Sequence, residues 1–272
     1  MQHVTLHPFA EAHIDAALAL SQAAGWPHGR GDWEMLLPMS QGFVACEGDR
    51  VIGTALRSNF GPDLSTLNMV LVADDRRQRG IGRTLAEAVM AGRSTRTWRL
   101  IATPSGRPLY ERLGFVTVGE IMQFQGVVKA APAATPLIAA HAKDRDALRH
   151  LEGQSFGADR AALTHWLMAN ATLAVHRGTN GALTGYAARR PFARGQLIGP
   201  VVATSLESAG ALVSQLSQGL RGVFLRLDIT DERLSPLLRH LGLDHVTTAP
   251  VMQRGPATAA KTRFAIASQA LG

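Results

Sequence analysis

The sequence predicts an α+β protein in which one unit of helices and strands occurs twice along the 272 residues. Three observations favour this fold class. The same order of elements can be read in both halves, an Ala/Pro-rich segment separates the halves, and the halves differ in net charge. The match between them lies in element order and not in residue identity, so a duplicated α+β unit is the economical interpretation.

The segment 129–136 is the predicted connection between the halves. It reads Lys-Ala-Ala-Pro-Ala-Ala-Thr-Pro and contains Pro132 and Pro136. Proline lacks a backbone N–H donor and restricts the residue before it, so this stretch favours a linker over a helix or a central strand. We therefore expect one domain at 1–128 and a second domain at 137–272.

The first half is expected to begin with helices and to continue into a meander of strands. Apolar spacing indicates the helices, β-prone apolar runs indicate the strands, and Gly114 ends the last helix. The predicted elements are helices at 11–24 and 33–37, strands at 42–47, 51–57 and 66–72, a helix at 81–90, a strand at 97–103, a helix at 108–113 and a pair of closing strands within 115–128.

The second half repeats this order. Ser205 is a candidate N-cap for a long helix that ends near Gln218, with Glu207 close to the positive end of the helix dipole. The other predicted elements are helices at 146–155 and 160–169, strands at 172–176, 183–189, 197–202 and 223–228, a helix at 232–241 and a strand near 246–253.

Composition excludes several classes of protein. Hydrophobic residues make up 46% of the chain, which is enough for a packed core and excludes global disorder. No apolar run approaches the roughly 18 residues of a membrane helix, and no secretory signal is visible, so we expect a soluble, cytoplasmic protein without membrane contact. The single Cys46 lies in an apolar strand, which favours a small buried side chain over a nucleophile.

The basic residues are unevenly distributed. Residues 1–128 contain 12 Lys/Arg and 12 Asp/Glu, whereas residues 129–272 contain 16 and 9, so the second half carries the entire net charge of +7. No arginine–aromatic interleaving or RNA-binding motif accompanies this charge, and we expect no nucleic-acid partner. His3 and His7 have i,i+4 spacing, but Pro8 follows and the region is expected to be a strand. The other histidines form no group with Cys or carboxylates at ligand spacing, so no metal site is expected.

The most informative segment is the turn after the 66–72 strand. Gly80 and Gly82 lie where a helix begins, and glycine lets main-chain N–H groups approach an anion closely. The helix adds unpaired N–H groups and a partial positive charge, and arginines occupy positions 76, 77, 79 and 83. These features indicate a site for a phosphate or pyrophosphate. The alternative is an ordinary strand-to-helix turn with solvated arginines.

The string RQRGIG at 77–82 resembles the signature of the GNAT acetyltransferase family, Arg/Gln-x-x-Gly-x-Gly/Ala after a strand and at the start of a helix. It lacks the third glycine of a dinucleotide fingerprint, and no Gly-Lys-Ser/Thr ending of a nucleoside triphosphate loop follows. Downstream, YERLGF at 110–115 resembles the family's Tyr-Glu-x-x-Gly-Phe block. The two markers occur in the expected order and at the expected spacing.

The resemblance extends over nearly the whole chain. The string GWPHG at 25–29, followed by Asp32 and Trp33, looks like a group of tandem GNAT proteins whose second half is a diverged YitH-type acetyltransferase domain. The segments of the second half that fit this group are 185–191, 198–203, 227–228 and 241–243. The resemblance implies two tandem GNAT folds, each a mixed, mostly antiparallel sheet flanked by helices.

The resemblance also implies acetyl-CoA as co-substrate and a primary amine as the usual acceptor. The amides of the glycine loop would hold the CoA pyrophosphate, and the preceding strand would pair with the pantetheine arm. A backbone N–H near Met69 or Val70 would polarise the thioester carbonyl. The residues assigned to CoA by position are Val70, Leu71, Val72, Arg77, Gln78, Arg79, Gly80, Ile81, Gly82, Arg83 and Thr84.

Acetyl transfer needs a neutral amine and a proton for the departing thiolate. Tyr110 matches the family's general-acid position, although a core tyrosine is the alternative. Asn68 would position the acceptor by a hydrogen bond, and Asp32 would either contact the amine or cap the 33–37 helix. Trp26 is either a wall of the acceptor pocket or a core residue. No general base is assigned.

The predicted function is N-acetyl transfer to a primary amine of a small molecule by direct attack in a ternary complex; the alternative is a non-catalytic CoA-binding sensor or scaffold. The second half has no glycine loop after its 197–202 strand, so we expect it to shape the acceptor pocket. Its excess positive charge suggests an acceptor that also bears an anionic group. The candidate residues of the second half are Asp228 and the pair Arg189 and Arg190. The alternative is that Asp228 is a carboxylate at the end of a strand and that the two arginines form a solvated basic edge. A monomer or homodimer is expected.

Overall fold

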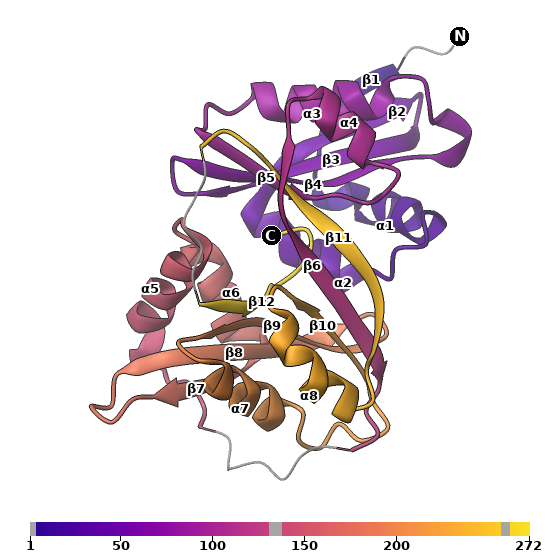
Figure 1. Cartoon of the computed structure of the whole chain (residues 1–272). Helices are drawn as coiled ribbons and strands as arrows, with labels where there is room; N and C mark the ends of the chain where they lie inside the picture. The colour runs from indigo at the N-terminus through magenta and orange to yellow at the C-terminus, as the bar shows by residue number, and fades with distance from the viewer. Residues whose placement is uncertain (1–3, 131–137, 257–261) are drawn as a thin grey trace.

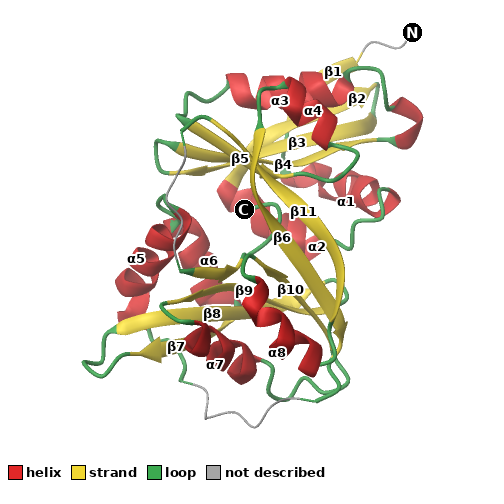
Figure 2. Ribbon diagram, viewed as in Figure 1, coloured by secondary structure: helices red, strands yellow, loops and turns green. Residues whose placement is uncertain are grey.

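The computed structural model describes residues 4–130, 138–256 and 262–272, which leaves most of the predicted linker and His3 outside the described residues. The described chain forms one continuous sheet with helices on both faces of each half (Figure 1, Figure 2). The α-helices are α1 (Ile14–Ala23), α2 (Arg30–Leu36), α3 (Ile81–Ala91), α4 (Arg107–Arg112), α5 (Arg145–Phe156), α6 (Ala161–Asn170), α7 (Leu206–Leu216) and α8 (Ser235–His240).

The strands follow the order β1-β2-β3-β4-β5-β11-β6-β10-β12-β9-β8-β7 across the sheet. Most neighbours are antiparallel, while β4 with β5 and β9 with β10 are parallel pairs, so the sheet is mixed as predicted. The strands are β1 (Val4–Pro8), β2 (Ser40–Glu47), β3 (Arg50–Phe60), β4 (Leu64–Val72), β5 (Thr97–Ile101), β6 (Val116–Val127), β7 (Thr172–Arg177), β8 (Leu183–Phe192), β9 (Gly195–Ala203), β10 (Phe224–Ile229), β11 (Asp244–Arg254) and β12 (Arg263–Ala265).

The predicted α+β fold with a repeated element order is confirmed, and local signals explain several boundaries. Ser205 caps α7, because its hydroxyl accepts a hydrogen bond from the Ser208 N–H at 3.1 Å. Gly114 adopts a φ of 84° directly after α4, a left-handed conformation that glycine tolerates and that ends the helix.

The prediction of two closing strands within 115–128 is wrong. These residues form one long strand, β6, because no turn interrupts them: Gly119 lies inside the strand and is not among the residues with positive φ. The antiparallel neighbour of β6 is β11 from the second half of the chain.

The two halves therefore exchange strands. β11 is hydrogen-bonded to β5 of the first half on one side and to β6 on the other, whereas β6 continues along β10 of the second half. Figure 1 shows β6 and β11 running side by side through the middle of the molecule. Each half's sheet is completed by a strand that the other half supplies.

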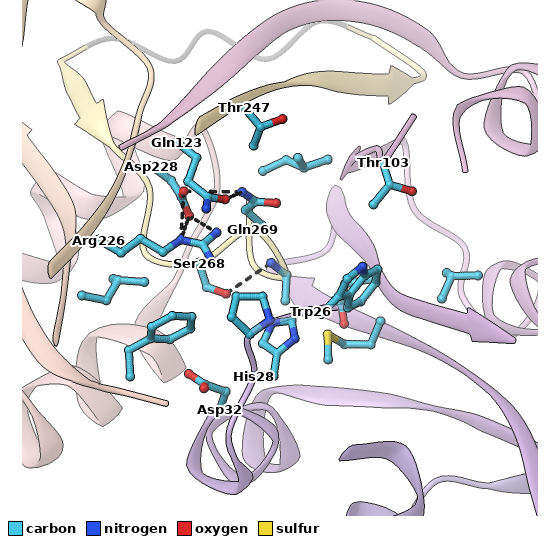
Figure 3. A pocket seen from close by; sticks show the side chains of 18 of the residues that line it. Trp26, His28, Asp32, Thr103, Gln123, Arg226, Asp228, Thr247, Ser268 and Gln269 are labelled. Atoms are coloured by element: carbon cyan, nitrogen blue, oxygen red, sulfur yellow. Dashed lines mark hydrogen bonds and ion pairs between the residues drawn. The ribbon is translucent and has the colours of Figure 1, made fainter. Parts of the chain in front are cut away.

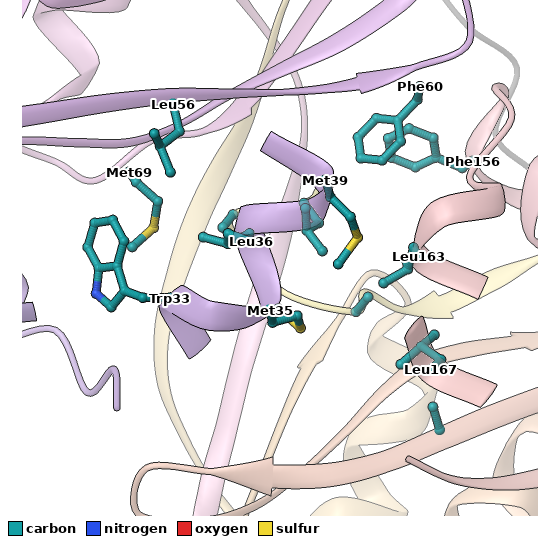
Figure 4. Close-up of a cluster of buried hydrophobic side chains, with 14 of the residues drawn as sticks. Trp33, Met35, Leu36, Met39, Leu56, Phe60, Met69, Phe156, Leu163 and Leu167 are labelled. Carbon is teal, nitrogen blue, oxygen red and sulfur yellow. The ribbon is translucent and has the colours of Figure 1, made fainter. Parts of the chain in front are cut away.

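A shared hydrophobic core also joins the halves. One cluster contains Trp33, Leu36 and Met39 from the first half and Phe156 and Leu167 from the second, all nearly inaccessible to water (Figure 4). Contacts of this kind resemble the interior of a single domain more than a mobile domain interface. The exchanged strands and the shared core thus hold the two halves in one fixed arrangement.

Candidate active site

The strands β4 and β5 separate part-way along their length. Their parallel pairing covers Leu64–Thr66 on β4 and 97–99 on β5. Beyond Thr66, this edge of β4 has no strand partner among the residues that the structure describes. The unpaired backbone of 67–72 forms one side of a V-shaped opening, an edge to which an extended ligand can add hydrogen bonds as a strand does.

A β-bulge lies in this opening. Met69 and Val70 stand opposite the single residue Ala55, since the register shifts between the pairs that precede and follow them. Met69 has a φ of 49°, and its carbonyl oxygen accepts a hydrogen bond from the Thr54 hydroxyl at 2.7 Å. A bulge changes the direction of the local backbone groups, so it turns N–H groups of β4 out of the regular ladder.

The glycine loop follows directly. β4 ends at Val72, and α3 begins at Ile81 after a turn in which Gln78 and Gly80 have φ values of 62° and 81°. Left-handed residues alternating with ordinary ones turn successive N–H groups toward a common point, and the N-terminus of an eleven-residue helix adds its own. The loop therefore has the geometry of an anion cradle.

Three of the four arginines around the loop are paired with carboxylates. Arg76 pairs with Glu47 at 2.8 Å, Arg77 with Asp74 at 2.7 Å and Arg83 with Glu87 at 2.8 Å. Arg79 has no carboxylate partner within the described part of the chain. The pairs of Arg77 and Arg83 are exposed, and such pairs contribute little free energy, so a phosphate can replace their carboxylates.

The opening leads into a cavity of about 230 Å³ between the two halves (Figure 3). Both halves supply its walls, and many of the lining side chains are polar or charged. The lining residues are Trp26, Pro27, His28, Asp32, Leu67, Asn68, Met69, Val70, Ile101, Thr103, Tyr110 and Gln123 from the first half, and Arg190, Phe192, Leu197, Arg226, Asp228, Thr247, Ser268, Gln269 and Ala270 from the second.

Tyr110 lies on α4 at the cavity wall and is 8% exposed. Its ring packs edge-on against Phe115, and burial raises the pKa of its phenol well above the ordinary value. At neutral pH the hydroxyl is therefore a proton donor, and no described residue occupies it with a hydrogen bond. Tyr110 thus packs in the core and also lines the cavity, and its role as general acid stays a prediction.

Asn68 lies on β4 next to the bulge. Its amide nitrogen donates hydrogen bonds to the Ser58 hydroxyl at 3.0 Å and to the Thr66 hydroxyl at 3.3 Å. Its Oδ1 is buried without a partner, and the residue lines the cavity. A buried, unpartnered carbonyl oxygen is an acceptor that a ligand N–H can satisfy.

Asp32 is held by the fold on two sides. Its Oδ2 accepts from the Gly29 N–H at 2.9 Å, and its Oδ1 is 2.7 Å from the Arg190 guanidinium. The helix α2 begins at Arg30, so Gly29 is its N-cap and Asp32 lies in its first turn. The alternative that Asp32 caps a helix at 33–37 is therefore wrong. The buried Asp32–Arg190 pair joins the two halves at the cavity.

A second buried ion pair lies on β10. Arg226 approaches Asp228 through Nε at 3.1 Å and through Nη2 at 2.8 Å, and Phe192 packs against the guanidinium. Of the second-half candidates, Asp228 and Arg190 line the cavity, whereas Arg189 donates to the Leu216 carbonyl at 2.8 Å and lies elsewhere. Arg226 was missed, although its spacing two residues before Asp228 places both side chains on one face of the strand.

His28 is a further residue that the sequence reasoning did not single out for chemistry. Burial lowers the pKa of its imidazole to about 4; Asp32 raises it, and Arg226 and Arg190 lower it further. The ring is therefore neutral at pH 7, and its buried Nδ1 has no hydrogen-bond partner. Trp26 packs edge-on against it and also lines the cavity, so Trp26 is part of the wall.

The remaining expectations concern metals, Cys46 and membranes. The described positions contain no group of three or more His, Cys, Asp or Glu that could hold a metal ion. Cys46 is buried in β2, and burial raises the pKa of its thiol. Within residues 4–130, 138–256 and 262–272, no helix is long and apolar enough to cross a membrane.

Comparison with known proteins identifies the class to which this fold and site belong. Residues 33–130 and 148–265 each match an acetyltransferase (GNAT) domain family. The chain belongs to the GNAT acetyltransferase family and carries two such domains in tandem. It is an acetyltransferase of the kind that uses acetyl-CoA.

A similar protein is the "Uncharacterized N-acetyltransferase YitH" of Bacillus subtilis (strain 168), which is 30% identical over 96% of both chains. Two solved structures share the fold. A putative acetyltransferase from Pyrococcus horikoshii has a TM-score of 0.83 at 18% identity and covers 100% of this chain and 97% of its own. A tandem GNAT protein from the clavulanic acid biosynthesis pathway has a TM-score of 0.68 at 17% identity, with 94% and 100% covered.

Proposed function

We propose that the protein transfers the acetyl group of acetyl-CoA to a primary amine of a small molecule, by direct attack in a ternary complex. The observation that carries this proposal is the continuity of the site. The anion cradle follows directly after the unpaired, bulged edge of β4, and that edge and Tyr110 line the cavity between the two halves.

The first half offers a fitting surface for the co-substrate. The amides from Gln78 to Arg83 suit the pyrophosphate, because the loop and helix N-terminus direct N–H groups to one point. The Thr84 N–H donates to the Gly80 carbonyl at 3.0 Å, so Thr84 lies beside the pyrophosphate without binding it through its amide. Arg77 and Arg79 lie beside it. The free edge at Val70, Leu71 and Val72 suits the amide groups of the pantetheine arm.

The chemistry follows from what surrounds the bulge. The amine nitrogen attacks the thioester carbonyl carbon, a C–N bond forms, and the C–S bond breaks when the tetrahedral intermediate collapses. A backbone N–H at Met69 or Val70 stabilises the oxyanion, and Tyr110 gives a proton to the departing thiolate. The proton that the attacking nitrogen loses passes to solvent, and the Tyr110 phenolate takes a proton back from solvent. Asn68 Oδ1 and His28 Nδ1, both unpartnered, are suited to accept hydrogen bonds from the amine.

The second half supports an acceptor that also carries an anionic group. Arg190 and Arg226 bring two guanidinium groups to the cavity, and each is paired with one carboxylate, Asp32 or Asp228. Nη1 of Arg226 makes none of the hydrogen bonds that join it to Asp228, so it remains available to a ligand carboxylate. The cavity thus offers donors for an anion and acceptors for an amine.

Replacement of Tyr110 by phenylalanine tests the catalytic assignment. We expect Tyr110→Phe to lower kcat by about 10²–10⁴-fold and to leave the Kd for acetyl-CoA unchanged, because only the proton donor is lost. Tyr186→Phe is the matched control. It removes the hydroxyl of the other tyrosine, which is buried and bonded to Glu152 away from the cavity. Unchanged turnover in Tyr110→Phe would refute the acid role.

The choice of acceptor is tested with pairs of amines. An amino acid and the amine that lacks only its carboxylate should differ in kcat/KM by at least about tenfold, in favour of the amino acid, as expected for one charge-assisted hydrogen bond. Arg226→Gln should remove the difference. Equal kcat/KM for the two amines would contradict the anionic-acceptor proposal. Acetyl-CoA binding without turnover on any amine would favour a sensor instead.

A further inference from the structure

The second half contains an opening equivalent to the one in the first half. β9 and β10 pair in parallel only at Gln196–Leu197 and Leu225–Arg226, and then separate as β4 and β5 do. In the first half this opening is the proposed position of the pantetheine arm. The second half therefore retains the backbone arrangement of a cofactor slot, without a glycine loop beyond it.

In the second half the chain itself fills the slot. β12 lies between the separated strands, with Arg263 and Ala265 paired to β9 and Ala265 also paired to Ile229 of β10. Backbone hydrogen bonds continue on both sides. Towards β10, the N–H of Thr230 donates to the Phe264 carbonyl at 2.9 Å and the N–H of Ile266 to the Asp228 carbonyl at 3.0 Å; towards β9, the N–H of Ala203 donates to the Thr262 carbonyl at 2.9 Å.

The fit of this segment leaves no room for a second occupant. Phe264, Ala265 and Ile266 are buried. At Gly199 on β9, a Cβ atom would lie 2.0 Å from the Ile266 carbonyl oxygen, so the two backbones are in direct contact. A pantetheine arm could enter only if the strand and its buried side chains left.

The same segment then continues to the cavity between the two halves. Ser268, Gln269 and Ala270 form part of the wall (Figure 3). The amide nitrogen of Gln269 donates to Gln123 Oε1 at 3.2 Å and to Asp228 Oδ1 at 3.4 Å. These bonds fix the side chain between β6 and β10 and use its nitrogen, so its carbonyl oxygen remains as an acceptor.

We propose that residues 262–272 are a resident substitute for the pantetheine arm in the second half, and that Gln269, carried on this segment, is a specificity-determining residue for the amine acceptor. The chain then holds one acetyl-CoA per molecule. Strands β9 and β10 hold β12 in place, and β12 in turn positions Gln269 in the wall of the cavity between the halves. This inference rests on the proposed function of that cavity.

Calorimetric titration of the full chain with acetyl-CoA tests the filled slot. We expect one site per chain in the wild type and no binding in Gly82→Asp, whose new carboxylate repels the pyrophosphate. The Cβ at position 82 would meet its nearest neighbour at 3.4 Å, an ordinary contact that the fold tolerates. Two sites in the wild type, or a site that survives in Gly82→Asp, would overturn the inference. No binding by the wild type would instead refute the proposed function.

The role of Gln269 is tested by acceptor preference. Gln269→Ala should raise the KM for the preferred amine about tenfold and change the ranking of amines in a panel, with the acetyl-CoA Kd unchanged. Gln269→Glu keeps the size but adds a negative charge beside Asp228, so it should shift preference toward cationic amines. Gln22→Ala, exposed on α1, is the control. An unchanged ranking in both Gln269 variants would show that the residue does not determine specificity.

Discussion

At the scale of single residues, His28 shows how the cavity sets the charge of its own groups. Its ring is enclosed between Trp26 and Asp32, with the guanidinium groups of Arg190 and Arg226 near enough to act on it. Burial and the two positive charges outweigh the single carboxylate and keep the imidazole neutral. A neutral ring accepts a hydrogen bond, whereas an imidazolium would repel a protonated amine.

His28 should make stability depend on pH. Its folded-state pKa of about 4 lies below the ordinary 6.5, so the unfolded chain binds a proton that the folded chain excludes, and the free energy of unfolding falls as pH drops through this window. Between pH of about 7.5 and about 5 the loss amounts to roughly 2 kcal/mol. Urea unfolding at both pH values should show that His28→Gln lacks this loss, while His150→Gln, changed at an exposed position, retains it.

The residues of the site were predictable to different degrees. Gly80, Gly82 and Tyr110 belong to short local strings whose spacing carries the signal. Tyr110, Asn68 and Asp32 all line the cavity, but their catalytic roles remain predictions. Arg226 and Gln269 reach the cavity only because the second half packs against the first, and no local pattern encodes that contact.

At the scale of elements, the turn before α3 depends on one backbone conformation. Gly80→Ala places a side chain at a φ of 81° in open space, so it should lower stability by about 1 kcal/mol through backbone strain alone. Because this residue directs the loop amides, the Kd for acetyl-CoA should rise at least about tenfold.

Gly48→Ala is a matched control for this change. Gly48 has a φ of 57°, also in open space, in the turn between β2 and β3. It should lose similar stability in urea unfolding and bind acetyl-CoA as tightly as the wild type in calorimetry. Equal affinity of the Gly80 and Gly48 variants would show that the loop conformation does not hold the co-substrate.

Elements with strong periodicity were predicted well, and elements defined by their partners were not. The helix expected at 81–90 is α3, and the strand expected at 66–72 is β4, each within two residues. β12 has three residues and exists because β9 and β10 leave a gap for it. The continuous β6 depends on β11 and β10, which are distant in sequence.

At the scale of the whole molecule, the exchanged strands and the shared core predict one cooperative unit. Leu167 lies in the second half, but its side chain is buried in the cluster that contains Trp33 and Leu36. Leu167→Ala should lower stability by about 2–5 kcal/mol, and hydrogen exchange should report the same loss for amides in β3 and in β8. A loss confined to β8 would mean that the halves unfold separately.

The exchange of β6 and β11 also determines when the strands can pair during translation. The first half leaves the ribosome with the edge of β5 uncovered, and β11, which covers it, ends at Arg254. At roughly 5–20 residues per second, that edge waits on the order of ten seconds for its partner. During this interval the nascent chain presents an open strand edge to which another chain could pair. The cavity, whose wall includes Gln269, is among the last features to form.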